Sequence, residues 1–204
     1  MEKLVKWLGH ASVRIEGDKI IYIDPWKLKK GGLKADIILI THDHYDHCSV
    51  EDVEKIKKED TKIVAHSLCK DRLKGEVYFV KPGDKLKLWD IEIEAVPAYN
   101  IGKKFHPKEY QGLGYIVTTK GVRIYHAGDT DYIPEMENIE TDIILLPIGG
   151  TYTMNVEEAV KAVNTIKPRL AIPIHYGSIV GSQSDAQKFK ELCGEVVRIL
   201  PPQD

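Results

Sequence analysis

Short apolar runs separated by turn residues recur along the chain and predict a protein rich in β-strands. Residues 12–17 read SVRIEG, residues 36–40 read DIILI, and residues 169–174 read RLAIPI. Runs rich in Val, Ile and Tyr, bounded by turn signals such as Gly-Asp at 17–18 and Pro-Gly-Asp at 82–84, are typical of β-strands. Comparable runs continue to the end of the chain, so we expect strands to form most of the core.

Three segments show instead the start and stop signals of helices. In each, a residue that can cap a helix N-terminus is followed three positions later by a side chain that can complete the cap. Pro168 is the stop signal of the second segment, and Gly194 is that of the third. The predicted starts are Ser49 with Asp52, Asn155 with Glu158, and Ser184 with Gln187.

The order of these elements predicts the class of fold. Antiparallel hairpins mixed with strand–helix units indicate two sheets covered by helices, a layered α/β architecture. No repeat, low-complexity tract or linker divides the sequence, and 204 residues suffice for a sizeable core. We therefore predict a single domain over residues 1–204.

Composition and charge exclude several classes of protein. Hydrophobic residues make up 43% of the chain and charged residues 29%, as in a globular protein. Lys and Arg number 29 against 31 Asp and Glu, so a duplex nucleic-acid binder is not expected, although a local patch can still bind a small anionic substrate. No apolar run is long enough for a membrane span. No feature of the sequence predicts the oligomeric state.

Cysteine usage and the first residues predict a cytoplasmic location. Cys48, Cys69 and Cys193 form no C-x-x-C pair, so a disulfide framework is not expected. The start MEKLVKWLGH lacks the apolar stretch of a secretory signal.

A dense cluster of ionisable side chains follows the run DIILI, where residues 41–48 read THDHYDHC. His42 and His44 are two positions apart, so in an extended segment they point to the same side and can reach one cation. Asp46 and His47 are adjacent, so we expect them to diverge and to serve a second cation. Imidazole and carboxylate are ligands for zinc, manganese or iron. The alternative is a surface loop that binds nothing, but so many charges beside a buried strand require a partner.

Further candidate residues stand where other apolar runs end. In layered α/β folds the strand ends at one edge converge on the functional site. A lone histidine at such a place is more often structural, and we expect this of His66, as of Cys48. His175 follows an apolar run directly, and Asp129 lies in a turn next to a glycine. The other candidates at run ends are Asn100 and His126.

The order of three motifs, THDHYDH, HAGDT and IPIHYG, resembles the metallo-β-lactamase superfamily. The opener WLGHAS, the segment IDPW and the loop LLPIGGTYTM look like the branch that contains ascorbate-6-phosphate lactonase and N-acyl-phosphatidylethanolamine phospholipase D. Together the motifs extend from Trp7 to Tyr176. The resemblance implies an α/β fold of the four-layer αββα sandwich type, with a dinuclear metal site between the loop edges of the two sheets.

The resemblance also implies a metal-dependent hydrolase that uses two divalent cations, zinc first, with manganese and iron as alternatives. A metal-bound hydroxide would attack a small ester-type substrate, a phosphodiester or a lactone. The implied ligands are His42 and His44 for the first metal, Asp46, His47 and His175 for the second, and Asp129 between them, with Asp46, Asp129 and His175 as catalytic residues.

One position departs from the family pattern. Where the family usually presents another histidine for the first metal, after the run VPAYN, this chain has Asn100, and a neutral amide is a poor metal ligand. His106, six residues later, can fold back to replace it, or a water can fill the place. As a further alternative, His106 contacts substrate or is an ordinary loop residue.

Several neighbouring residues have two readings each. His10 is expected either near the metals or in the core. Near the metals, it would support a metal ligand or contact substrate. Asp24 is expected to orient loop backbone or a ligand histidine rather than to bind metal. His126 shares a strand face with Ile124, so core packing competes with a role in the site. Three lysines of one loop can either bind an anion or form a solvated face. They are Lys103, Lys104 and Lys108.

Three other functions are weighed against the hydrolase. A tRNA-processing nuclease shares the loop motif, but the basic excess is missing. Di-iron redox proteins of the superfamily commonly carry Glu where His44 stands. A non-catalytic metal-binding or scaffold module of the same fold stays open because of Asn100.

Overall fold

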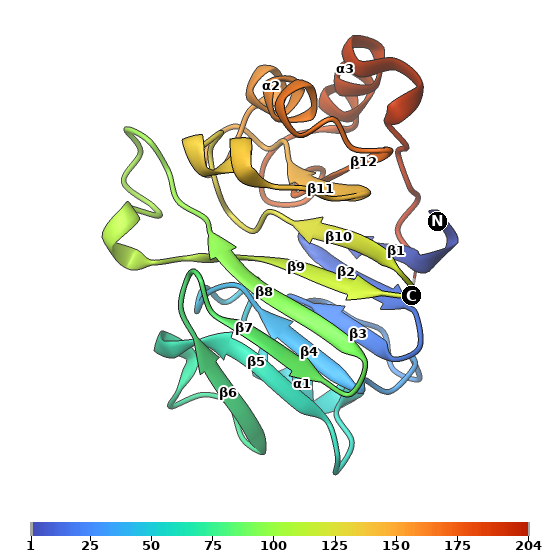
Figure 1. Ribbon diagram of the computed structural model, residues 1–204, viewed down its shortest axis with the longest axis vertical. Helices are drawn as coiled ribbons and strands as arrows, with labels where there is room; N and C mark the ends of the chain where they lie inside the picture. The colour runs from blue at the N-terminus through green and yellow to red at the C-terminus, as the bar shows by residue number, and fades with distance from the viewer. Residues whose placement is uncertain (1, 204) are drawn as a thin grey trace.

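The computed structural model describes residues 2–203 and contains two β-sheets packed face to face (Figure 1). In the first sheet the strands lie in sequence order, with antiparallel pairing from β1 to β3 and parallel pairing from β3 to β6. Its strands are β1 (Val5–Gly9), β2 (Ser12–Glu16), β3 (Ile20–Ile23), β4 (Ile37–Ile40), β5 (Lys62–His66) and β6 (Glu76–Val80).

The second sheet is also mixed and runs in the order β12-β11-β10-β9-β8-β7. Neighbours from β7 to β10 are antiparallel, whereas β10, β11 and β12 are parallel. Its strands are β7 (Lys85–Leu88), β8 (Ile91–Pro97), β9 (Leu113–Thr119), β10 (Val122–His126), β11 (Ile143–Pro147) and β12 (Leu170–Ile174).

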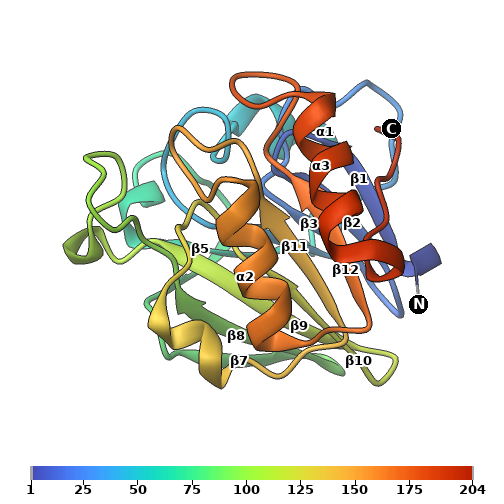
Figure 2. The same ribbon diagram turned by 90° about the horizontal axis from the view of Figure 1, so that it is seen from above.

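Helices cover the outer face of each sheet, which confirms the predicted αββα sandwich. Helices α2 (Val156–Ile166) and α3 (Gln183–Cys193) lie over β11 and β12 (Figure 2). Helix α1 (Val50–Ile56) packs on the first sheet. Within residues 2–203 no helix combines the length and apolarity needed to cross a bilayer. Short 3₁₀ turns are η1 (Glu2–Leu4), η2 (Ser67–Cys69), η3 (Lys108–Tyr110), η4 (Pro134–Asn138) and η5 (Gly194–Val196).

Strand β4 shows why two layers form on its two sides. Ile37 and Leu39 belong to the core between the sheets, whereas Ile38 and Ile40 belong to the cluster beneath α1. Because successive side chains alternate between faces, a strand buried on both must be apolar throughout. The continuous run DIILI is therefore the signature of this central position.

The helix starts agree with the sequence signals in two of three cases. Ser49 and Asn155 cap α1 and α2 as predicted. The prediction for α3 is wrong by two residues, because Ser182 rather than Ser184 is the N-cap. The Asp185 side chain accepts the Ser182 N–H at 2.8 Å and completes that capping box. Two serines at alternate positions offer both registers, and the sequence pattern does not separate them.

The strand directions place four chain segments at one edge of the sandwich. Strands β8, β10 and β12 run the same way, since β8 and β10 are both antiparallel to β9. The end of β4 meets them there, because the Leu113 N–H donates to the Thr41 carbonyl at 3.2 Å. A second link joins the sheets at this edge, where the His175 N–H donates to the His10 carbonyl at 2.8 Å.

Asp52 joins α1 to the segment that follows β3. Its carboxylate accepts the backbone N–H groups of Lys27 and Leu28, each at 2.9 Å, the Ser49 hydroxyl at 2.7 Å and the Lys55 ammonium at 2.9 Å. Burial alone would raise the pKa of Asp52, but these donors lower it below its usual value. We expect Asp52→Ala to lower the free energy of unfolding by about 2 kcal/mol, because the two backbone donors lose their acceptor.

The pH dependence of this loss follows from the direction of the shift. A carboxylate with a folded-state pKa below the unfolded value of about 3.9 stabilises the protein above that value, and the effect is lost as the pH falls through the folded-state pKa. Urea unfolding of both proteins should therefore show a difference that is largest near neutral pH and shrinks in acid. A difference that stays constant with pH would contradict the role of the ionised group.

Candidate metal centre

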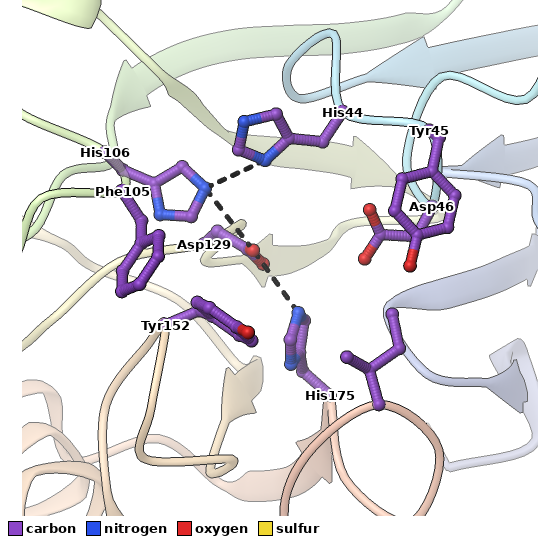
Figure 3. Close-up of a pocket in the computed structure, with 9 residues that line it drawn as sticks. His44, Tyr45, Asp46, Phe105, His106, Asp129, Tyr152 and His175 are labelled. Carbon is purple, nitrogen blue, oxygen red and sulfur yellow. Dashed lines mark hydrogen bonds and ion pairs between the residues drawn. The ribbon is translucent and has the colours of Figure 1, made fainter.

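The loops at the shared edge bring together side chains from four strand ends (Figure 3). The segment after β4 contributes the most side chains, and the remaining side chains come from segments much later in the sequence. The contributors are His42, His44, Asp46 and His47 after β4, His106 after β8, Asp129 after β10, and His175 after β12.

His106 folds back onto the first two histidines of the motif. His42 Nε2 lies 3.1 Å from His44 Nδ1, and His106 Nε2 lies 3.2 Å from the same nitrogen. One ring nitrogen from each residue lies within 4.8 Å of the others. The structure thus agrees with the alternative in which the loop folds back toward the site. The His106 imidazole then lies near Asn100.

Asp46, His47 and His175 form a second group, in which His10 is a fourth member within the same 4.8 Å. The expectation that Asp46 and His47 diverge is wrong, since His47 Nε2 lies 3.6 Å from Asp46 Oδ2. The motif is not extended here: the N–H groups of His47 and Cys48 both donate to the carbonyl of His44, at 3.1 and 2.8 Å. This turn brings adjacent side chains to the same side.

Asp129 lies between the two groups. Its Oδ2 atom is 3.2 Å from His175 Nε2, 3.4 Å from His47 Nε2, 3.6 Å from His106 Nε2 and 3.9 Å from His42 Nε2. One carboxylate oxygen therefore faces imidazoles of both groups. In Figure 3 the carboxylate points into the space between His106 and His175.

Asp24 holds His47 from behind. Its buried carboxylate contacts His47 Nδ1 at 2.7 Å and accepts the Thr41 N–H at 2.8 Å and the Thr41 hydroxyl at 2.7 Å. A carboxylate at Nδ1 keeps the proton on that nitrogen and directs the Nε2 lone pair toward the site. Asp24 thus orients both a histidine and loop backbone, and it lies at the back of the ring rather than among the inward-facing groups.

Asn100 has the corresponding role for His106. Its amide nitrogen donates to Asp131 at 3.0 Å and to the Tyr152 carbonyl at 2.9 Å, which fixes the orientation of the amide. The amide oxygen then accepts from His106 Nδ1 at 3.1 Å, and Nε2 is left facing the site. The residue that departs from the family pattern therefore positions the histidine that lies beside His44.

The two remaining histidine candidates have different surroundings. His10 Nε2 lies 2.9 Å from Asp46 Oδ2, and its ring centroid is 3.9 Å from that of His175. His10 and His175 both have left-handed backbone, with φ of 50° and 56°, a strained conformation that is common at functional sites. His126 is fully buried and contacts the Ala11 carbonyl at 2.8 Å, so it supports the β1–β2 turn that carries His10.

Close packing against His175 explains a glycine in the loop after β11. A Cβ atom on Gly149 would lie 2.6 Å from the His175 carbonyl oxygen and 2.6 Å from a methyl group of Val180. The close approach at Gly149 is therefore to the backbone of His175. His66 is structural as expected, with Nε2 3.1 Å from the Tyr110 carbonyl.

Burial keeps several imidazoles in the neutral form that a metal ligand requires. It lowers the pKa of His42 well below the ordinary value of 6.5, and His47 lowers it further. Burial also lowers the pKa of His106. Both rings therefore offer a lone pair at neutral pH.

The carboxylates of Asp24 and Asp129 lie on either side of His47, and their negative charge requires a positive charge nearby. Burial would raise the pKa of Asp129, but His175 and His47 hold it well below its usual value. Burial would lower the pKa of His47, but Asp129 and Asp24 raise it well above 6.5. A divalent cation placed among these groups would supply the positive charge and leave His47 neutral.

Unpaired buried atoms indicate where such a cation fits. His47 Nε2, His175 Nε2 and Asp129 Oδ1 are buried without a hydrogen-bond partner. Buried polar atoms are nearly always paired, so unpaired buried atoms on three neighbouring residues indicate ligands. The combination of imidazole and carboxylate suits zinc and related divalent ions. The His/Asp cluster is therefore able to bind metal.

A cavity of about 270 Å³ opens above the cluster. Tyr152 lies in its wall, whereas Tyr176 is buried and stacks on Trp7 with ring centroids 4.9 Å apart. Three further wall residues could not be predicted from local sequence patterns, since only the spatial course of the loops brings them there. They are Tyr45, Phe105 and Ile179.

Comparison with known proteins gives matches over nearly the whole chain. Residues 4–175 match the family described as "Beta-lactamase superfamily domain". The "UPF0173 metal-dependent hydrolase" proteins of Thermoplasma acidophilum and Pyrococcus furiosus are each 38% identical, over 96% of this chain and 93% and 94% of their own. The structure of a metallo hydrolase from Ignicoccus hospitalis has a TM-score of 0.81 at 27% identity, covering 98% of this chain and 95% of that one.

Proposed function

The chain belongs to the metallo-β-lactamase superfamily, in its UPF0173 family of metal-dependent hydrolases, and from this we propose that it hydrolyses a small ester-type substrate with the help of two divalent cations. The observation that carries the proposal is the position of Asp129. One of its oxygens faces imidazoles from three different loops, between two groups that each satisfy the geometry of a cation site.

The proposed ligand groups differ slightly from those implied by the sequence. Bound cations would polarise the scissile bond and lower the pKa of a bound water. Zinc is the first choice for such ligands, and manganese or iron are alternatives. The proposed ligands are His42, His44 and His106 for one ion, Asp46, His47 and His175 for the other, and Asp129 between them.

The residues around these ligands have positioning roles in the proposal. Asp24 and Asn100 hold His47 and His106 with their Nε2 atoms inward. His10 holds Asp46 through the contact of 2.9 Å. Fixing the ligands in advance avoids a cost of reorganisation when substrate binds.

The bond that is cut is proposed to be that of a lactone or a phosphodiester. This rests on the resemblance of the segments around His10 and Asp24 to the branch with ascorbate-6-phosphate lactonase and N-acyl-phosphatidylethanolamine phospholipase D. The scaffold alternative depended on Asn100, and the return of His106 to His44 removes that reason for it.

The test is hydrolysis by protein reconstituted with Zn²⁺ or Mn²⁺ of a phosphodiester reporter, simple lactones and a β-lactam. We expect turnover of the lactones or the phosphodiester, which chelation abolishes and metal restores. Asp46→Ala is the control, because a reaction that survives it arises from free metal. Failure of every substrate at full metal occupancy would contradict the proposed substrate class.

A further inference from the structure

The cavity above the cluster has a polar floor and apolar walls. The ionisable residues of the cluster form the floor, and side chains from four loops form the walls (Figure 3). Within residues 2–203, no lysine or arginine lines the cavity. The wall residues are Tyr45, Phe105, Tyr152 and Ile179.

Three of the four wall residues are unusually exposed for apolar side chains. Tyr45 is 65% exposed, Phe105 47% and Ile179 38%. Single exposed apolar residues are ordinary, but several around one cavity mark a binding surface. The Phe105 and Tyr152 rings meet edge to face, with centroids 4.5 Å apart, and Tyr45 meets Trp26 in the same way at 6.1 Å. These contacts hold the walls in place before any ligand arrives.

Two loop lysines that could grip an anion are directed at the protein instead. Lys103 donates to Asp131 and, at 2.7 Å, to the Thr153 carbonyl. Lys108 pairs with Glu135 at 2.9 Å. Neither residue lines the cavity, and the same holds for Lys104. A second anionic group on a substrate would therefore lose its hydration without gaining a cation.

We propose that the cavity selects substrates whose group next to the scissile bond is uncharged and apolar, either aromatic or aliphatic, and that Phe105 determines this preference. The inference rests on the proposed function, because it assumes that the bond is cut at the cluster. A charge on the reacting group itself would meet the metals, so the walls select only what lies beside it. The volume of about 270 Å³ limits the substrate to a small molecule.

The first measurement compares two hydroxamates on the zinc-loaded protein by titration calorimetry. Phenylpropanohydroxamate and succinic acid monohydroxamate share a metal-binding group, but their tails are apolar and anionic respectively. We expect the phenyl compound to bind about tenfold more tightly, because its tail buries apolar surface and the carboxylate tail finds no cation. The second measurement compares kcat/KM for phenyl butyrate and phenyl hemisuccinate, which differ in the same way.

A charge placed in the wall should reverse the preference. Phe105→Lys is expected to weaken the binding of the phenyl compound and to strengthen the binding of the carboxylate compound. The ratio of their affinities should then fall to about one or below. Ile101→Lys is the matched control, because Ile101 is an exposed apolar residue of the same loop that does not line the cavity. It adds the same charge to the loop, and the ratio should stay as in the unaltered protein.

The outcomes separate this inference from the proposed function. Equal or tighter binding of the carboxylate compound to the unaltered protein would overturn the inference, and so would an equal effect of the two lysine substitutions. Tail preference as expected, without turnover of any ester, would support the cavity's selectivity and count against the proposed substrate class. Absence of bound zinc and of binding by either hydroxamate would overturn both.

Discussion

Asp129→Ala is expected to reduce turnover about a thousandfold or more and to lower the amount of metal bound per chain. The carboxylate lies between the two proposed ligand groups, so its loss would remove the proposed shared ligand and leave mutually facing imidazoles with one fewer negative charge. A metal ion supplies several kcal/mol of transition-state stabilisation, which corresponds to this loss of rate. Metal content by emission spectroscopy and kcat on the best substrate are the measurements.

Asp129→Asn is the matched control for volume. It retains the shape of the side chain and removes the charge, so it should lose activity nearly as completely while unfolding like the parent protein. If Asp129→Ala retained full metal content, or if its kcat fell less than that of a variant outside the site, Asp129 would not be the shared ligand.

Asp24→Ala is expected to lower the free energy of unfolding more than Asp52→Ala does. It should also weaken metal binding. The substitution leaves the Thr41 N–H and hydroxyl and the Nδ1 of His47 without their buried acceptor. We expect the metal-free protein to lose about 3 kcal/mol of unfolding free energy. The affinity for metal should fall about 10- to 100-fold, as for other residues that orient a ligand histidine.

Asp24→Asn distinguishes the two effects. Its amide oxygen can still accept from Thr41, so most of the stability should return. The NH₂ group cannot accept the Nδ1 proton of His47, so the loss of metal affinity should persist. Urea unfolding of the metal-free protein and a competitive zinc titration measure the two quantities. Equal metal affinity in Asp24→Asn and the parent protein would count against an orienting role.

The fold could be predicted well because its determinants are local. The apolar run of β4 and the caps Ser49 and Asn155 act within a few residues, and each appears in the structure where the sequence places it. Where local signals were ambiguous, as at Ser182 and Ser184, the prediction failed by two residues.

The site was predicted less evenly, for physical reasons. Candidates in one short segment are visible from their density, whereas His175 and Asp129 gain weight only from their places at the ends of apolar runs, taken together with the histidine motif. The fate of His106 depends on the path of a loop, which no local pattern specifies. The expected divergence of the Asp46 and His47 side chains was wrong because a turn replaces the extended backbone that alternation requires. The cavity walls come from four loops, and their meeting is a property of the whole fold.

The hydrogen bonds from Leu113 to Thr41 and from His175 to His10 join the two sheets at the edge where the cluster lies. The proposed ligands come from both sheets as well, so the binding energy of the metals is available only while the sheets remain docked. Motions that part the sheets at this edge would separate the ligands and let the ions leave. The rate of metal exchange should then depend on how often the two sheets separate transiently at this edge. Bound ions would in turn resist that separation and hold the two halves of the fold together.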